Sequence, residues 1–355
     1  MDITRSGYEP VYCTIVPPHL LDRLSQAENP AIAGAARRTL VQDEANRSRR
    51  LTTAAATARP TITGAAEATP NRTIHDAQNG TELPGTKVRS EGEEPGQDAT
   101  VNRAYAGLGA TFDLFLKGFE RNSIDGNGLP LIATVHYDEK YGNAFWDGKQ
   151  MVFGDGDGEI FLDFTIPVDV MAHELTHGVT QYTANLAYQG QSGALNESVS
   201  DVFGALVKQY TLGQTADQAD WLIGEGLLAP DVQGTALRSM KEPGTAYDDD
   251  VLGKDPQPGH MDDYVDTDQD NGGVHINSGI PNRAFYLLAT RLGGKAWERA
   301  GQIWYDVLTG GEITTDCTFT DFAKATVGKA AERYGEGDEH EAVLKAWSQV
   351  GVPTA

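Results

Sequence analysis

The sequence predicts an α+β protein with a β-rich N-terminal lobe, a mainly α-helical C-terminal lobe and a histidine-bearing helix between them. Turn signals separate short alternating segments from residue 72 to residue 164, and helical periods dominate from residue 167 onward. The residues before position 72 differ in composition from both of these ranges. We therefore divide the chain into an N-terminal extension (1–60), a β-rich lobe that includes the histidine-bearing helix (61–182) and a helical lobe (183–355).

The N-terminal extension has two parts. Residues 11–24 form a short apolar patch with two adjacent prolines, which predicts an extended backbone over residues 15–18. Residues 29–70 are rich in Ala, Thr and Arg, and this concentration of basic residues in an acidic chain predicts an exposed, protease-sensitive linker. Residues 1–24 hold no continuous apolar segment, so a standard secretory signal is not visible. We expect secretion by another route or a cytoplasmic protein.

The β-rich lobe is indicated by alternating runs such as residues 132–137, by turns at 79–80, 125–128 and 155–158, and by one helical stretch, 100–119, that interrupts them. An active site in a two-lobed chain usually lies in the cleft between the lobes. In the C-terminal part, helices are predicted at residues 168–182, 194–210, 279–292, 295–308, 318–334 and 338–350.

Composition narrows the function classes. The formal net charge of −23 argues against a nucleic-acid partner, whose phosphates the protein would repel. The acidic groups favour solubility and could hold cations, although a solvated surface is the simpler interpretation of any single one. The sequence contains no run of 18 apolar residues, so it predicts no membrane span. The two cysteines, Cys13 and Cys317, are too few for a disulfide framework.

A histidine pair marks the predicted central helix. The segment reads His173-Glu174-Leu175-Thr176-His177, so the two histidines share one helix face. Two imidazoles on one face can hold one Zn²⁺ at about 2.0–2.1 Å each. Glu174 would lie beside the metal, which is the place for a general base that acts on water. A chance match in a buried central helix is the alternative.

A catalytic zinc needs a third protein ligand and one open position. Glu197 and Asp201 lie four residues apart a short distance downstream. Glu197 can bind the metal, and Asp201 can accept the second ring N–H of a ligating histidine, which fixes its tautomer. Alone, such a pair would more often be a solvated helix face.

A third cluster lies in the glycine-rich segment that follows Asp270. Hydrolysis of a peptide by zinc-activated water develops an oxyanion that needs a hydrogen-bond donor. His275, held protonated by Asp270, could supply it, although a histidine in such a loop is often only structural.

These motifs resemble those of the thermolysin-like metallopeptidases, most closely the protealysin-like branch with short propeptides. The resemblance runs from about residue 72 to the C-terminus. It implies a zinc endopeptidase, made as a zymogen, whose N-terminal extension (1–60) is an inhibitory propeptide and linker. Six segments carry it in the family's order: 143–148, 154–158, 173–177, 196–201, 237–240 and 270–280.

The resemblance implies roles for the residues of the catalytic centre. His173, His177 and Glu197 would bind zinc. Glu174 would be the general base and then the proton donor to the leaving amine. The remaining implied roles are oxyanion stabilisation by Tyr188 and His275, orientation of His275 by Asp270, and support of His173 by Asp201.

The resemblance also implies how substrate is held. Asn143, the backbone of Ala144, and Arg238 would bind the main chain of peptide or protein substrates. The residue after the cut is expected to be bulky and apolar, as the family prefers. Its pocket would be lined by Leu237, Val170 and Ile223.

One departure from the family concerns calcium. The family's paired calcium site next to the zinc helix uses several carboxylates, of which Asp169, Asp220 and Glu225 are present. Lys208 and Leu222 stand where two further acids would lie. A lysine ammonium inside a site for two divalent cations is electrostatically untenable, so we doubt the double site, while a single calcium elsewhere stays possible.

Cys13 is the one cysteine of the removable extension. We predict that its thiolate binds the open zinc position in the precursor, because a thiolate is a strong zinc ligand. The extended segment that follows would lie in the cleft like a substrate. The alternatives are a small apolar residue that packs the propeptide and a disulfide with Cys317.

Two other function classes compete with an active endopeptidase. An inactive scaffold that binds a partner has no reason to keep the complete set of His173, Glu174, His177, Glu197 and His275. A zinc hydrolase of non-peptide amides or esters is disfavoured by the peptide-holding residues.

Overall fold

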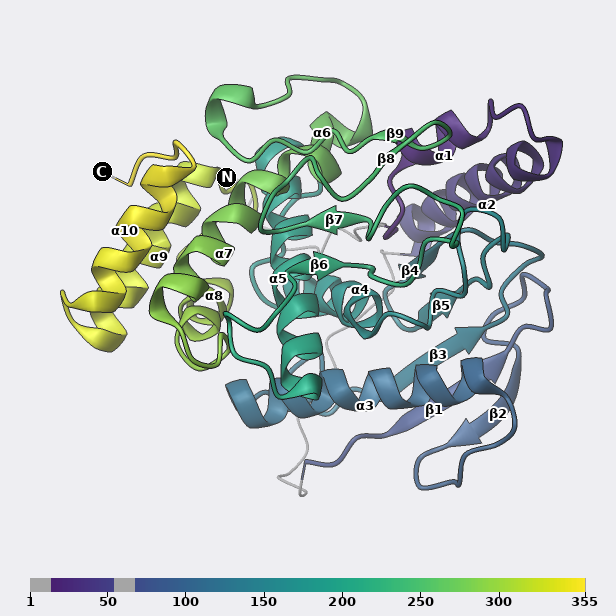
Figure 1. The fold of residues 1–355 in the computed structure, drawn as a ribbon. Coiled ribbons are helices and arrows are strands. Elements are labelled where there is room, and N and C mark those ends of the chain that lie inside the picture. The colour runs from purple at the N-terminus through teal and green to yellow at the C-terminus, as the bar shows by residue number, and fades with distance from the viewer. Residues whose placement is uncertain (1–13, 54–67, 355) are drawn as a thin grey trace, which may run out of the picture.

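The computed structural model describes residues 14–53 and 68–354, and the side chains of all of these except 47–53. The α+β class is confirmed: a sheet lies in the N-terminal lobe, and helices fill the C-terminal lobe (Figure 1). Of two further helices in the N-terminal extension, one bonds to the β lobe, and the shorter one lies beside the β8–β9 pair (residues 248–254) of the C-terminal lobe (Figure 1). Among the described residues, no helix is both long and apolar enough to span a bilayer.

The sheet has five strands in the order β2-β1-β3-β5-β4. The central strands are parallel to one another, and both outer pairs are antiparallel. This arrangement places β4 at one edge, where its outer backbone groups can pair with another chain segment. The strands are β1 (Arg72–Asp76), β2 (Thr86–Ser90), β3 (Leu131–Val135), β4 (Ala144–Trp146) and β5 (Met151–Phe153).

Helix α3 (Ala99–Phe119) crosses one face of the sheet (Figure 1). It begins at Asp98, whose carboxylate accepts the backbone N–H groups of Thr100 and Val101, and it ends at Glu120 in the left-handed conformation. Its apolar face is buried against the sheet and against the helix at residues 168–181.

The two lobes meet at α4 (Val168–Gln181) and α5 (Gly190–Leu212), which pack along each other. Gly204 permits their close approach, because a Cβ there would lie 2.7 Å from the carbonyl oxygen of Asp169. The closeness of these two backbones determines which side chains meet across the interface.

The remaining helices form the C-terminal lobe, and α6 is interrupted at residues 271–273 by left-handed backbone. The predicted helices are all present, but the one expected at 194–210 begins earlier, and the one expected at 295–308 begins only at Ala300, after Arg299 with a non-helical backbone. They are α6 (Asp270–Asn277), α7 (Gly279–Leu292), α8 (Ala300–Thr309), α9 (Phe319–Tyr334) and α10 (Asp338–Gln349), with the short pairs β6 (Leu222–Ile223) and β7 (Arg238–Ser239), and β8 (Asp248–Asp249) and β9 (Gly253–Lys254).

The N-terminal extension corrects one prediction. Residues 29–70 were expected to be a linker, but Pro30–Thr53 forms a helix, α2, and residues 54–67 lie outside the described residues. Alanine and arginine favour helices, and the buried Ile32, Ala33 and Ala36 give α2 a packed side. Tertiary packing therefore orders a segment whose composition suggested a solvated chain.

The start of the extension follows the sequence more closely. The extended backbone predicted for residues 15–18 is found only in part: Thr14 forms a strand bridge and Pro17 is extended, but the chain bends at Ile15 and Val16, and helix α1 (Pro18–Leu24) begins at a proline, where the missing N–H costs nothing. Leu20, Leu21 and Leu24 are buried against the rest of the molecule. Cys317 is a buried free thiol, and its proposed disulfide partner Cys13 lies outside the described residues.

Candidate metal and active site

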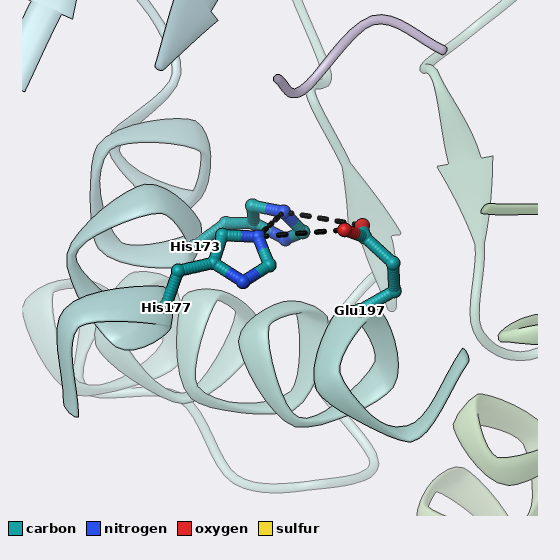
Figure 2. A group of neighbouring side chains, drawn as sticks. All are labelled: His173, His177 and Glu197. Carbon is teal, nitrogen blue, oxygen red and sulfur yellow. Dashed lines mark hydrogen bonds and ion pairs between the residues drawn. The ribbon is translucent and has the colours of Figure 1, made fainter. Parts of the chain in front are cut away.

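Three side chains converge at the meeting of α4 and α5. His173 and His177 project from one face of α4, and Glu197 reaches them from α5 (Figure 2). The Nε2 atoms of the histidines are 3.0 Å apart, and each lies 3.5 Å from one oxygen of Glu197. All three side chains are buried.

The chemistry of this donor set fits a zinc ion. The Nδ1 atom of His173 lies 2.8 Å from Asp201, and that of His177 lies 2.8 Å from the amide oxygen of Asn196, so both Nδ1 atoms donate outward. Each facing Nε2 atom can then present a lone pair to the space that it shares with the buried Glu197 carboxylate. A divalent cation in that space would satisfy all three groups, and two imidazoles with one carboxylate are ligands that zinc prefers.

Glu174 lies next to this group without joining it. One oxygen accepts the backbone N–H of Trp146 at 3.1 Å, at the end of strand β4. The other oxygen has no hydrogen-bond partner among the described residues. Burial raises the pKa of Glu174 to about 8, despite the opposing effect of His173. A carboxyl group that can gain and lose a proton near neutral pH therefore lies beside the metal ligands.

His275 faces the same space from α6. Asp270 lies 2.6 Å from its Nδ1 and also accepts its backbone N–H at 2.9 Å. Burial lowers the pKa of His275, but Asp270 and Glu197 raise it more, to about 9. The ring is thus protonated at neutral pH, and its Nε2 lies 3.2 Å from the hydroxyl of Tyr188, which donates to Glu197.

Asp201 serves two sides of the site. Besides His173, it accepts two hydrogen bonds of 2.8 Å from the guanidinium of Arg238 on β7. Burial would raise the pKa of Asp201, but Arg238 and His173 hold it down at about 2. Asn282 on α7 donates a further bond of 2.8 Å. The sequence analysis missed Asn282, because a buried asparagine on a helix carries no motif of its own.

The edge strand β4 and Arg238 bind an extended segment of the chain itself. Thr14 forms an antiparallel bridge with Phe145, and the Ile15 N–H donates to the Ala144 carbonyl at 3.2 Å. Arg238 donates to the Ile15 carbonyl at 3.1 Å.

The amide of Asn143 completes this pairing. Its oxygen accepts the Val16 N–H at 3.0 Å, and its nitrogen donates to the Val16 carbonyl at 3.3 Å. The same nitrogen lies 3.1 Å from Asp43 of α2, a buried partner that sequence reasoning did not find. The residues predicted to hold a substrate main chain therefore hold residues 14–16.

The predicted pocket residues come from different elements but lie in one apolar cluster. Val170 on α4, Ile223 on β6 and Leu237 beside β7 are all buried, and the Leu237 N–H donates to the Ile223 carbonyl at 2.9 Å. Ile15 is also fully buried and belongs, like these three residues, to the main hydrophobic core of the molecule. Cys13, the predicted zinc ligand of the precursor, lies outside the described residues.

The carboxylates considered for calcium surround a lysine instead. The Lys208 ammonium lies 2.7 Å from Asp220, 3.0 Å from Glu225 and 3.6 Å from Asp169. Asp169 is fully buried, and burial raises its pKa to about 6 against the opposing effect of Lys208. A positive charge of the chain itself occupies the space between the acids.

Comparisons with known proteins agree with this geometry. Residues 41–181 match the model of the thermolysin metallopeptidase catalytic domain, and residues 184–352 match that of its alpha-helical domain. An extracellular metalloprotease of Pectobacterium carotovorum is 58% identical over 282 residues, 79% of this chain and 81% of that protein. Protease PrtS of a Photorhabdus strain is 55% identical over 284 residues, 79% of this chain and 76% of its own.

A solved structure is similar over nearly the whole length. The precursor of protealysin, a metalloproteinase from Serratia proteamaculans, is 52% identical, with a TM-score of 0.88 over 96% of this chain and all of that one. With the metal-binding triad, these matches show a zinc-dependent metalloendopeptidase that is made as a zymogen. The chain therefore belongs to the thermolysin family of metallopeptidases, on its protealysin-like side.

Proposed function

We propose that this enzyme cuts peptide bonds on the N-terminal side of bulky apolar residues, with Glu174 as general base. The observation that carries the proposal is the pairing of Thr14–Val16 with the site: a peptide segment bonds to Ala144, Asn143 and Arg238 through its main chain. Main-chain recognition of this kind accepts many sequences, as an endopeptidase requires.

The chemistry follows from where the polar groups lie. Zinc held by His173, His177 and Glu197 would supply a Lewis acid and lower the pKa of a water molecule. Glu174 would accept the proton of that water and pass it to the leaving amine, which suits a carboxyl group whose pKa lies near neutrality. Protonated His275 would donate a hydrogen bond to the oxyanion that develops.

Supporting residues hold these groups in place. Tyr188 would share oxyanion stabilisation with His275, because the two side chains are in contact. Asp270 would keep His275 charged and oriented, and Asp201 would fix the tautomer of His173 through their bond of 2.8 Å. Each role depends on a contact between buried groups, where low dielectric strengthens electrostatic effects.

The preference for an apolar residue after the cut rests on Ile15. Ile15 is the residue after Thr14, whose carbonyl His275 contacts. The Ile15 side chain is buried in the hydrophobic core that also contains Val170, Ile223 and Leu237. An isoleucine or leucine that is fully buried gains roughly 1.5–3 kcal/mol from the hydrophobic effect. A charged residue there would lose its hydration without gaining a partner.

We propose that residues 1–60 are an inhibitory propeptide and linker, followed by catalytic lobes at 61–182 and 183–355. Thr14–Val16 occupies the residues that a substrate needs, and α1 and α2 anchor it. Maturation would remove about the first 50–70 residues, because exposed linkers are cut first, and N-terminal sequencing of the active form tests this. An active form that keeps its N-terminus would contradict it. Zinc binding by Cys13 stays a prediction.

Two further proposals concern cations and location. We propose that Lys208 replaces the paired calcium ions next to the zinc helix, because its ammonium already neutralises their carboxylates. We also propose that the enzyme is secreted, since the Pectobacterium relative is named as extracellular. Detection of the protein in washed cells but never in culture medium would contradict secretion.

A matched pair of variants tests the catalytic assignment. Glu174→Gln should keep zinc at one ion per chain and lower casein hydrolysis about 10²–10⁴-fold, because general acid–base catalysis contributes that much. His177→Ala should instead lose zinc, measured by elemental analysis. A chelator should abolish the wild-type activity, and added zinc should restore it.

The competing functions give different outcomes in the same assay. A binding scaffold would leave casein intact with and without zinc. A hydrolase of small amides or esters would act on those substrates and leave casein intact. Casein hydrolysis that survives Glu174→Gln, after contaminating proteases are excluded, would remove the role of Glu174.

A further inference from the structure

We propose that the Thr14–Ile15 peptide bond is a cleavage site of the chain's own active site, cut within the same molecule. The inference rests on the proposed catalytic roles, and it adds a specific bond inside the N-terminal extension. It differs from maturation in the linker, because the bond lies between α1 and the N-terminus, far in sequence from residues 54–67.

The first step of the argument is the position of the Thr14 carbonyl. Its oxygen lies 3.1 Å from Nε2 of His275, whose other ring nitrogen, Nδ1, lies 2.6 Å from Asp270. That nitrogen is also 3.6 Å from an oxygen of Glu197, one of the three metal-binding side chains. A carbonyl that accepts from the oxyanion donor beside the metal ligands occupies the place of the reacting carbonyl.

The second step is the register on the other side of this bond. The Ile15 N–H, which would become the leaving amine, donates to Ala144, and the Ile15 carbonyl accepts from Arg238. The next residue, Val16, makes both of its main-chain bonds to Asn143. A shift by one residue would place either Thr14 at the position of the fully buried Ile15, or Pro17, which has no N–H, opposite the Asn143 amide oxygen, so the pairing favours one register.

The third step is the proton acceptor. Thr14 bridges to Phe145, and the following residue, Trp146, donates its N–H to Glu174. In the proposed cut, water adds its oxygen to the Thr14 carbonyl carbon and gives a proton to Glu174. The C–N bond then breaks, and Glu174 returns the proton to the nitrogen of Ile15. The second proton of the water also passes to this nitrogen, so the products are a Thr14 carboxylate and an Ile15 ammonium group, and water is the only co-reactant.

The two products are held unequally. The half that begins at Ile15 keeps its bonds to Ala144, Arg238 and Asn143 and the buried leucines of α1. The half that ends at Thr14 is held, among the described residues, by its bridge to Phe145 and its contact with His275. The described contacts therefore keep the half that begins at Ile15 in the cleft after the cut.

The cut needs a water molecule at the metal, and a thiolate bound there would exclude it. The full chain with Cys13→Ser removes this obstacle and is the test molecule. With zinc, intact-mass spectrometry should show a chain that begins at Ile15 and a free peptide 1–14. The rate should be unchanged on tenfold dilution, because the reaction is intramolecular.

Two matched controls separate this site from general proteolysis. Cys13→Ser with Glu174→Gln should stay uncut, also when a trace of matured enzyme is added. Cys13→Ser with Ile15→Asp should be cut at this bond more than about tenfold more slowly, because an unpaired carboxylate would enter an apolar pocket. Cleavage of casein by the matured enzyme confirms the proposed function independently of this bond.

The register also has a readout that needs no turnover. In the zinc-free Glu174→Gln chain, the amides of Ile15 and Val16 should exchange with deuterium slowly, and Asn143→Ala should speed exchange at Val16. The proposal is overturned if Cys13→Ser matures and cuts casein while Thr14–Ile15 is never cut, or if these two amides exchange freely. Cutting of the wild-type chain at this bond would support the site and end the zinc-binding role of Cys13.

Discussion

Replacing Lys208 by methionine removes the positive charge that three carboxylates share and keeps most of the apolar volume. Of these acids, Glu225 is about half exposed and Asp220 about a third, so their pairs with Lys208 are screened and contribute roughly 1 kcal/mol or less each. Asp169 is 1% exposed and would be left as an uncompensated buried charge. Breaking a buried pair costs about 3–5 kcal/mol.

The penalty has an upper bound, because Asp169 can take up a proton instead. Its pKa is about 6 with Lys208 present, and loss of the ammonium raises that pKa further. Protonation of Asp169 costs about 1.4 kcal/mol for each unit by which the pH exceeds its pKa, and at neutral pH this is less than the cost of burying the unpaired charge. We therefore expect Lys208→Met to lower the free energy of unfolding by about 2–3 kcal/mol at about pH 7.5.

The sign of the pH effect follows from the same shift. An acid whose folded pKa is raised destabilises the fold as pH rises through that pKa, so the deficit of Lys208→Met should shrink by about 1 kcal/mol or more towards pH 5. Urea unfolding of the Glu174→Gln chain, with and without Lys208→Met, measures this without self-digestion. Lys208→Glu should be destabilised more strongly and recover in millimolar calcium.

Equal stability of the Lys208→Met and parent chains at neutral pH would refute this reasoning. A deficit that is the same at both pH values would show that Asp169 does not carry the penalty. Lys208→Leu is the matched control for side-chain shape, and it should behave as Lys208→Met does.

Two further predictions concern other polar contacts. Hydrogen bonds to Asp155 and Asp98 raise the pKa of His136 to about 9. The contribution of His136 to the free energy of unfolding should therefore be complete below about pH 6.5 and fade as the pH rises through 9. His136→Gln should remove this pH dependence from urea unfolding measured between these pH values. An unchanged profile would remove His136 as its cause. Asn282→Ala should lower kcat/KM about tenfold, because Asp201 loses a hydrogen bond and is held less firmly, and a lost bond to a buried charged group costs about 1.5 kcal/mol. An effect on stability alone would show that Asn282 has no part in positioning Asp201.

The sequence predicted the contacts that depend on spacing within one helix. His173 and His177, and likewise Glu197 and Asp201, lie four residues apart, and a helix brings each pair to one face whatever the rest of the fold does. That the two helices pack closely enough for these faces to meet depends on tertiary contacts such as that at Gly204. The resemblance supplied this second part.

Contacts between distant segments were not predictable from local pattern. Asp43 meets Asn143 across a separation of 100 residues, and Asn282 meets Asp201 across 81. Neither residue belongs to a motif, and both are polar types that usually lie on the surface. The linker prediction for residues 29–70 failed for a related reason, because composition measures local preference and α2 is ordered by what it packs against.

The position of Asp201 has a thermodynamic consequence. One carboxylate orients a metal-binding histidine and also fixes the arginine that holds the peptide carbonyl. Zinc and a bound peptide both favour the same placement of the Asp201 carboxylate, so each raises the affinity for the other, and linkage makes the two factors equal. Whatever factor bound zinc adds to the affinity for a peptide, a bound peptide adds to the affinity for zinc. Under metal scarcity, the filled cleft of the precursor therefore holds its zinc more tightly than the emptied cleft of the mature enzyme does.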